Sequence, residues 1–302
     1  DIDHESVYHF FTLGYIPHPW TIYRNVHQLP PAGRLIVEAD RQTVKLDRYW
    51  QVNTEIDRSL SREDAGEELR RLVDDSVRRR MISDVPLGAF LSGGLDSSII
   101  VALMAQHSSS PVKTFHIDFA ESEYSERQYA RAVAERFGTD HHELVVRPSA
   151  VDVLDELVHF FDEPFGDSSA VPTYYVSQIT RQHVTVALAG DGGDESFGGY
   201  ERYQRILRRR NLPGVLRKTL GGLGAGVHRC LPRTAPGRRY FRALGLDHFR
   251  HFVVGTNEYE TRELLTPEFL ESLGDFSTFN SLRGVMEDVD TSDRLNPYSS
   301  FD

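Results

Sequence analysis

The chain has 302 residues, of which 39% are hydrophobic and 26% are charged, and its formal net charge is -11. This composition is ordinary for a folded globular protein, and the length is enough for one large or two modest domains. No apolar run approaches the roughly 20 residues needed to cross a bilayer, and the acidic balance argues against a nucleic-acid-binding surface. The single cysteine, Cys230, allows no internal disulfide. We therefore expect a cytoplasmic protein with neither a membrane nor a nucleic-acid partner.

The first part of the chain is expected to consist of short strands and turns. Arg34–Ala39 and Thr43–Leu46 are two runs that predict a β-hairpin. Residues 53–62 are polar and are expected to form a linker. From Ser61 to Ile82, apolar residues recur at helical spacing behind an acidic first turn, and this pattern predicts a helix.

The middle of the chain alternates between predicted strands and helices. The strands are expected at Leu87–Leu91, Val112–Phe119, His141–Val146 and Val184–Ala189, and the helices at Ser97–Gln106, Ser125–Phe137, Ala150–Phe161, Val171–Arg181 and from about Asp194. Such alternation predicts an α/β fold with a parallel sheet covered by helices on both faces. Residues 211–302 show helical patches broken by glycine and proline, and predict a helical part.

The segment LSGGLDSS, Leu91–Ser98, joins a predicted strand to a predicted helix and is a candidate anion site. Gly93 and Gly94 allow the backbone to approach a ligand, the following helix offers free N–H groups, and three serines add hydroxyl donors. Asp96 would repel phosphates unless a hard cation such as Mg²⁺ bridged them. No GxxxxGK[ST] sequence occurs, so the loop favours holding a departing pyrophosphate over γ-phosphate transfer. The alternative is a serine-rich turn that caps a helix.

The segment ALAGDGGDESFGGY, Ala187–Tyr200, also follows a strand and precedes a helix. In a parallel sheet both loops would lie at the carboxyl ends of strands, where ligand sites of α/β folds form. Asp191, Asp194 and Glu195 would then face the first loop, and Asp194 could share a metal with Asp96. The alternative is an acidic, solvated turn that caps the next helix.

A third polar segment, Asp162–Ser169, joins two predicted helices. The carboxylates of Glu163 and Asp167 could bind an amino group of a substrate, and Glu195 of the second loop is a further candidate for substrate binding. A Pro–Gly turn with polar decoration explains this segment equally well.

These segments together resemble the synthetase domain of glutamine-dependent asparagine synthetases. The resemblance covers roughly residues 5–205 and rests on SGGLDSS, AGDGGDESFGGYERY, TFHIDF at 114–119, HHELVV at 141–146 and DEPFGDSSAVPTYYVS at 162–177, which occur in the family's order. The stretch FFTLGYIPHPWTIYRNVHQLPPAGRLIV resembles the end of that family's glutaminase domain. The loop SGGLDS alone is less specific, because other pyrophosphatase-type ligases such as GMP synthetase share it.

Two departures from the family pattern concern the ends of the chain. The family's glutaminase uses an N-terminal cysteine nucleophile, whereas this chain begins with Asp1. The family also carries a basic segment with a lysine that contacts pyrophosphate, and no similar segment precedes Asp302. We therefore expect a fragment cut at both ends. Its expected domains are the end of a glutaminase-type domain at 1–52, the linker 53–62, an ATP-binding synthetase domain at 63–210 and an incomplete helical part at 211–302.

The resemblance implies an adenine-nucleotide α-hydrolase-like fold of the pyrophosphate-loop type, with ATP and Mg²⁺ as cofactors. It implies metal binding by Asp96 and Asp194 and a role for Asp191 in forming an acyl-adenylate. Ala189 stands where the family often has serine. Contacts made by the backbone at this position should be possible with either residue. The implied ATP-binding residues are Leu91, Ser92, Gly93, Gly94, Leu95, Asp96, Ser97, Ser98, Ile117, Ala189 and Gly190.

The expected reaction is adenylation of the aspartate β-carboxylate, followed by attack of ammonia to give asparagine, AMP and pyrophosphate. The ammonia would come from glutamine through a glutaminase domain upstream in the full-length protein, and a homodimer is compatible with the resemblance. Two alternatives stay open. One is a β-lactam synthetase-like enzyme or another amidotransferase that acts on a different carboxylate. The other is a fragment that binds nucleotide without turnover.

Overall fold

A computed structural model describes residues 1–38, 40, 43–53, 55, 57, 59–119, 125–146, 150–201, 203–204, 219, 222–224, 226–228, 230–232, 235, 241 and 257–282. The chain divides into two compact units. Unit 1 comprises Asp1–Glu55, Phe161–Gly166 and Gly199–Asp302, and unit 2 comprises Ile56–Phe160 and Asp167–Gly198. Among the described residues, no helix is long and apolar enough to span a membrane.

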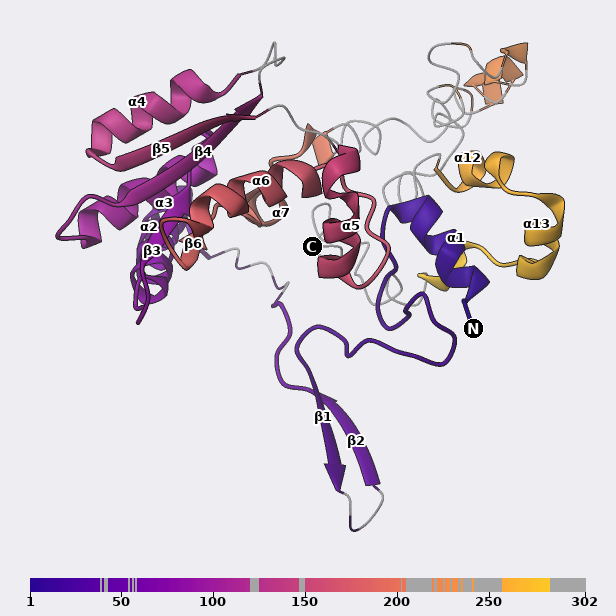
Figure 1. The fold of residues 1–302 in the computed structure, drawn as a ribbon. Helices are drawn as coiled ribbons and strands as arrows, with labels where there is room; N and C mark the ends of the chain where they lie inside the picture. The colour runs from indigo at the N-terminus through magenta and orange to yellow at the C-terminus, as the bar shows by residue number, and fades with distance from the viewer. Residues whose placement is uncertain are drawn as a thin grey trace. The chain divides into compact units, whose positions relative to one another are not determined.

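Unit 2 contains a four-stranded sheet in which every pairing is parallel (Figure 1). The spatial order of the strands is β5-β4-β3-β6. Their bounds are β3 Leu87–Phe90, β4 Lys113–Phe119, β5 Asp140–Val146 and β6 Val186–Leu188. The predicted α/β class and parallel sheet are confirmed, and β6 is shorter at both ends than the predicted strand Val184–Ala189.

The helices of this part of the chain follow the predicted order. They are α2 Arg62–Arg80, α3 Leu95–His107, α4 Arg127–Phe137, α5 Ala150–Phe161, α6 Ala170–Arg181 and the short α7 Gly193–Phe197. The Ser61 hydroxyl accepts a hydrogen bond from the Asp64 N–H at 3.1 Å, so the predicted start of α2 is the real N-cap. Gly138 ends α4 in the left-handed conformation that favours glycine.

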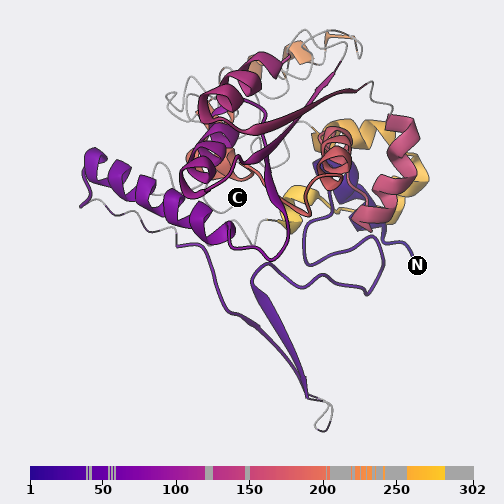
Figure 2. The same cartoon turned by 60° about the vertical axis from the view of Figure 1, so that its left-hand side comes forward.

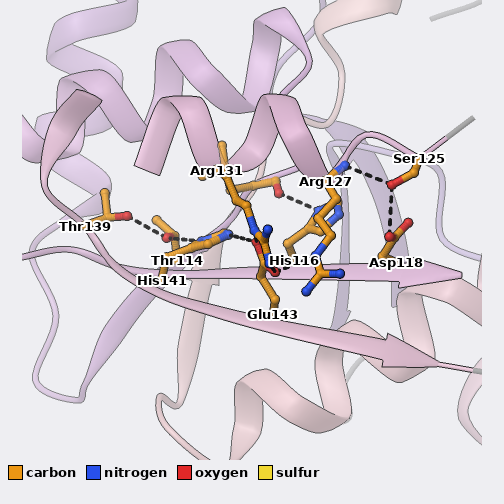
Figure 3. Close-up of polar contacts among 10 residues, drawn as sticks. Thr114, His116, Asp118, Ser125, Arg127, Arg131, Thr139, His141 and Glu143 are labelled. Carbon is orange, nitrogen blue, oxygen red and sulfur yellow. Dashed lines mark hydrogen bonds and ion pairs between the residues drawn. The ribbon is translucent and has the colours of Figure 1, made fainter. Parts of the chain in front are cut away.

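Side-chain alternation along β4 shows that helices cover both faces of the sheet. On one face lie Thr114 and His116, on the side where α4 packs (Figure 3). On the other face the Phe115 ring stacks on His142 at 5.3 Å and lies 5.7 Å from His183, which follows α6. The buried core between the sheet and α2, α3 and α4 consists of Val77, Ala89, Leu91, Val101, Met104, Val112, Ala130 and Ala134.

Unit 1 contains a two-stranded hairpin and several helices. The hairpin pairs β1 Gly33–Glu38 with β2 Thr43–Arg48 in an antiparallel register that sets Gly33 opposite Arg48, which confirms the predicted hairpin. The described helices of this unit are α1 His4–Leu13, α12 Asn257–Leu264, α13 Pro267–Leu273 and α14 Thr278–Ser281. The rest of the predicted helical part 211–302 lies largely outside the described residues.

Helix α1 corrects the expectation that the first fifty residues hold only strands and turns. Its start is capped by Asp3, whose carboxylate accepts from the N–H and the hydroxyl of Ser6, and Gly14 ends it at a φ of 86°. The periodicity was hidden because the buried face of the helix carries Ser6, Tyr8, His9 and Thr12 instead of aliphatic side chains. Buried polar groups of this kind do not register as a hydrophobic stripe.

Those polar side chains of α1 meet the C-terminal helices, which lie beside it in both views (Figures 1 and 2). The Tyr8 hydroxyl donates to the Glu258 carbonyl at 3.1 Å, and the Thr261 hydroxyl donates to the Phe11 carbonyl at 3.0 Å. The His9 ring packs edge-on against Phe276 with centroids 5.2 Å apart. The two ends of the described chain are thus held together by specific polar and aromatic contacts.

Candidate functional site at the ends of β3 and β6

The order of the strands creates a topological switch point between β3 and β6. From β3 the chain moves outward through β4 to β5, and it then returns to the opposite side of β3 as β6. Ala89 of β3 is the register partner of Leu188 of β6, so the two strands end side by side. The loops that follow them carry the two glycine-rich motifs. In open α/β sheets the crevice at such a point is where ligands bind.

The first loop is pressed against the start of α4. Gly93 has a φ of 88°, and a Cβ added to it would lie 2.5 Å from the Ala130 nitrogen and 2.6 Å from the Tyr129 Cβ. No side chain fits at that position without moving α4. The next residue, Gly94, is extended and begins α3, whose first turn carries Asp96. The first N–H groups of a long helix therefore open directly onto the switch point.

The serines of this loop are bonded to the loop itself. The hydroxyls of Ser92 and Ser97 lie 2.9 Å apart, and the Ser92 hydroxyl accepts from the Gly94 N–H at 3.1 Å. The Ser98 hydroxyl donates to the Gly94 carbonyl at 2.6 Å. These bonds hold the loop in one shape, with Ser97 buried and Leu95 76% exposed.

The second loop closes over Asp96. A Cβ on Gly190 would lie 2.8 Å from the Asp96 Cβ, and a Cβ on Gly193 would lie 2.7 Å from the Asp96 Cγ. The carboxyl group of Asp96 therefore rests against the backbone immediately before Asp194. The structure brings together the two loops that the sequence singled out, because both glycines lack the atom that would block the approach.

The carboxylates at this junction suit a magnesium ion that is bound together with phosphates. They suit less well a metal site in which the protein supplies all the ligands. Among the described residues there is no group of three or more His, Cys, Asp or Glu side chains that could hold a metal ion. Asp96 and Asp194 supply hard oxygen donors on two adjoining segments. Mg²⁺ is typically bound by one or two carboxylates together with substrate phosphates and water, so this donor set suits it.

The other predicted nucleotide contacts lie on the same edge of the sheet. Leu91 is buried, and its N–H donates to the Phe115 carbonyl at 2.9 Å. Ile117 is half-buried on β4, opposite Leu144 of β5. Ala189 and Gly190 directly follow β6. In the second loop Asp191 is exposed, whereas Asp194 and Glu195 are half-buried.

The two candidate carboxylates of the third segment fall in different units. The Glu163 carboxylate, in unit 1, accepts a hydrogen bond from the Ile22 N–H at 3.0 Å. In the same segment the Gly166 N–H donates to the Gly14 carbonyl at 2.7 Å, which ties these residues to the end of α1. The Asp167 carboxylate, in unit 2, accepts from the Ser169 N–H at 2.8 Å. Each carboxylate thus bonds a backbone N–H of its own unit.

Sequence reasoning missed a polar layer between α4 and the sheet, drawn in Figure 3. Glu143 of β5 accepts from Arg131 at 2.7 Å and from Arg127 at 2.7 Å. These two guanidinium groups lower the pKa of the Glu143 carboxyl to about 2, and the hydrogen bond from Arg131 has the largest effect. The Thr114 hydroxyl lies 2.8 Å from Nδ1 of His141. Burial lowers the pKa of the His141 ring.

A signal for this layer was present in the sequence. Thr114, His116 and Asp118 alternate on β4, and His141 and Glu143 alternate on β5. An ordinary half-buried strand would present apolar residues on its covered face. A polar face on two adjacent predicted strands therefore indicated a bonded layer. In the structure this layer lies under the helix that supports Gly93.

The fold and the loop junction define a class: α/β proteins with a parallel sheet in which two glycine-rich turns meet at a switch point. The comparisons narrow this class. The profile of the family described as asparagine synthase matches residues 68–296. The chain belongs to the asparagine synthase family.

Curated relatives agree with this membership. The chain is 40% identical over 222 residues to a putative glutamine-hydrolyzing asparagine synthetase 2 of Methanocaldococcus jannaschii, covering 72% of this chain and 43% of the relative. It is 36% identical over 227 residues to a putative glutamine-hydrolyzing asparagine synthetase of Mycobacterium tuberculosis, covering 73% and 35%. It is 34% identical over 229 residues to glutamine-hydrolyzing asparagine synthetase 1 of Bacillus subtilis, covering 73% and 35%. The chain thus spans less than half the length of these relatives.

Proposed function

We propose that this chain carries the synthetase centre of an ATP-dependent ligase that forms asparagine from aspartate and ammonia. The observation that carries the proposal is the contact of Asp96 with Gly190 and Gly193. It joins an anion-binding helix start to an acidic loop at a switch point of the sheet, as a site for a magnesium–triphosphate requires. The names of the relatives support aspartate as the acyl substrate.

In the proposed reaction, the aspartate β-carboxylate attacks the α-phosphorus of ATP, pyrophosphate leaves, and ammonia then displaces AMP from the β-aspartyl-AMP. A bound Mg²⁺ would supply charge neutralisation for the phosphates, with Asp96 and Asp194 as its protein ligands. The N–H groups at the start of α3 would bind the departing pyrophosphate oxygens. Because Gly94 carries no Cβ, those oxygens can approach the backbone closely there, whereas the missing Cβ of Gly93 makes room for α4.

Asp191 is the proposed catalytic residue. It is exposed and lies in the second loop between Gly190 and Gly193, the two glycines that rest against Asp96. A carboxylate there can orient the acyl-adenylate or accept a proton from the attacking ammonia. Either role needs an ionised oxygen, which an amide of the same shape does not provide.

The proposal is tested by aspartate-dependent exchange of pyrophosphate into ATP, measured on the full-length protein. If Asp191 orients the acyl-adenylate, Asp191→Asn should reduce the exchange rate by on the order of a hundredfold, because misplaced reactants lose rate steeply. Asp84→Asn is the matched control, because Asp84 is exposed and precedes β3 at the opposite edge of the sheet. Full exchange in Asp191→Asn would reject its role in the adenylation step. Full exchange together with an unchanged rate of ammonia-dependent AMP release would reject its role as a proton acceptor as well. Exchange that depends on another carboxylic acid and not on aspartate would reject aspartate as the acyl substrate.

The wider assembly is also part of the proposal. A glutaminase domain upstream in the full-length protein would release ammonia from glutamine, and the hairpin region 1–52 would be the end of that domain. The domain boundaries expected at 53–62 and 210 belong to the same proposal, as does a cytoplasmic location. Limited proteolysis of the full-length protein checks the boundaries, because cleavage inside 53–62 should release a stable synthetase fragment.

A further inference from the structure

We propose that His116 is a positioning residue for the loop Leu91–Ser98. Its Nδ1–H holds the carbonyl oxygen of Leu91 and thereby fixes the path by which the loop leaves β3. The inference rests on the proposed ATP-dependent function, since it names a residue outside both glycine-rich loops that governs the same site. The predicted consequence is a change in affinity for ATP.

The contact lies where the ladder between β3 and β4 ends. The last register pair is Phe90 with Phe115, and beyond it the Leu91 N–H still donates to the Phe115 carbonyl at 2.9 Å. The Leu91 carbonyl is bonded to the side chain of the next residue of β4, because Nδ1 of His116 lies 3.0 Å from this oxygen. Two consecutive residues of β4 therefore hold both polar backbone groups of Leu91.

The ring of His116 has one defined tautomer in this arrangement. A carbonyl oxygen only accepts hydrogen bonds, so Nδ1 must carry the proton. Nε2 is buried and has no hydrogen-bond partner among the described residues. The whole side chain is 5% exposed. A buried imidazole with one unpaired nitrogen is a net cost unless its single bond contributes elsewhere. The bond to Leu91 is that contribution.

This bond differs in kind from the others that shape the loop. The hydroxyl bonds among Ser92, Ser97 and Ser98 join the loop and the first turn of α3 to themselves. The contact of His116 joins the loop to the sheet, beside the bond from the Leu91 N–H to the Phe115 carbonyl. Without it, the loop could keep its internal shape and still shift relative to β6 and the second loop, which would misplace the N–H groups that are proposed to bind phosphate.

The test compares three variants of the full-length protein by aspartate-dependent exchange of pyrophosphate into ATP. His116→Phe keeps a ring of similar size but removes the donor, and should raise the KM for ATP about tenfold with the KM for aspartate at saturating ATP unchanged. His116→Asn places an amide N–H near the position of Nδ1 and should restore most of the affinity. Thr114→Val is the matched control, because Thr114 is buried on the same face of β4 and bonds Thr139 and His141, away from the loop.

An unchanged KM for ATP in His116→Phe overturns the inference, and so does an equal rise in Thr114→Val, which would indicate general loosening of β4. Should His116→Phe not fold, ring ¹⁵N shifts of the wild-type protein decide the question, because an Nδ1 of His116 without a proton contradicts the proposed bond. Wild-type protein that binds ATP by calorimetry without aspartate-dependent exchange would reject the proposed function alone. The same variants measured by calorimetry would then decide the role of His116.

Discussion

Each unit has a titratable side chain beneath a helix, half-buried in unit 2 and buried in unit 1, and the two groups have opposite preferences for charge. In unit 2, Glu143 lies under α4 between two guanidinium groups, and its pKa falls to about 2, so its ionised form is favoured. In unit 1, His9 lies on the inner face of α1, and burial lowers its pKa to about 4 although Asp3 and Glu258 oppose the shift. Counter-charges within bonding distance keep Glu143 charged, whereas desolvation outweighs more distant carboxylates at His9.

The two units should therefore respond differently to acid. Protonated His9 is favoured in the unfolded chain, so stability from unit 1 is complete above pH 6.5 and declines as the pH falls towards about 4. Ionised Glu143 is favoured in the folded chain, so stability from unit 2 is complete above pH 4.5 and declines as the pH falls towards about 2. Unit 1 should therefore loosen first.

The largest effect is expected in unit 2, from Gly93→Ala. The new methyl group would lie 2.5 Å from the Ala130 nitrogen, at a φ of 88° that L-residues avoid. Backbone strain and displacement of α4 together should lower the free energy of unfolding by about 3 kcal/mol or more. ATP binding should be lost. Thermal unfolding and ATP titration measure both effects.

Gly138→Ala serves as the control for Gly93→Ala. Gly138 also has a positive φ, 63°, but an added Cβ would meet nothing within 4 Å. Gly138→Ala should therefore lower the free energy of unfolding only by the strain of the left-handed backbone, about 1–2 kcal/mol. Equal destabilisation by the two substitutions would show that the contact between the loop and α4 does not constrain the site.

The second effect is the acid sensitivity of unit 1. Lowering the pH from 7 to 4 should destabilise this unit by on the order of 2–3 kcal/mol through His9. Trp20 reports on it, because its ring lies 5.1 Å from that of His9. The chain has two tryptophans, so fluorescence during urea unfolding is followed in a Trp50→Phe background.

His9→Gln removes the titrating group and should abolish most of the pH dependence between 6.5 and 4 while keeping a polar side chain. The same dependence in His9→Gln and in the parent would contradict the role of His9. It would move the acid sensitivity to other groups and weaken the contrast between the units.

The smallest effect is expected from Glu143→Gln in unit 2. Both arginines are partly exposed, at 36% and 52%, so solvent screens the pairs. Glu143→Gln should lower the free energy of unfolding by about 1–2 kcal/mol at pH 7. The difference from the parent should shrink as the pH falls below 4.5, because the parent then begins to lose the same interaction. Urea unfolding at pH 7 and pH 3.5 measures this, and a pH-independent difference would contradict the depressed pKa.

Local pattern was a good guide to unit 2. The strands and helices around Leu87–Phe137 were predicted to within a few residues, because apolar runs bounded by glycine and serine caps mark parallel strands and their helices. The contact of Asp96 with Gly190 and Gly193 was anticipated only in outline, since it depends on β6 pairing with β3. The polar layer of Glu143 and its arginines was missed, because the alternating polar residues of β4 and β5 do not show which side chains of α4 bond them.

In unit 1 the sequence indicated the hairpin, because its two runs follow each other closely along the chain, but it did not indicate α1. That helix buries Ser6, Tyr8 and His9: Asp3 bonds Ser6, and partners from residues 257–282 bond Tyr8 and His9, which makes such burial favourable. The sequence by itself determined the alternating α/β framework and the two glycine-rich loops, because these depend on local periodicity and on glycine's backbone freedom. Only the tertiary structure decided which loop touches which and how His116, Glu143 and His9 are paired. Those outcomes depend on long-range packing and on desolvation, which no local pattern encodes.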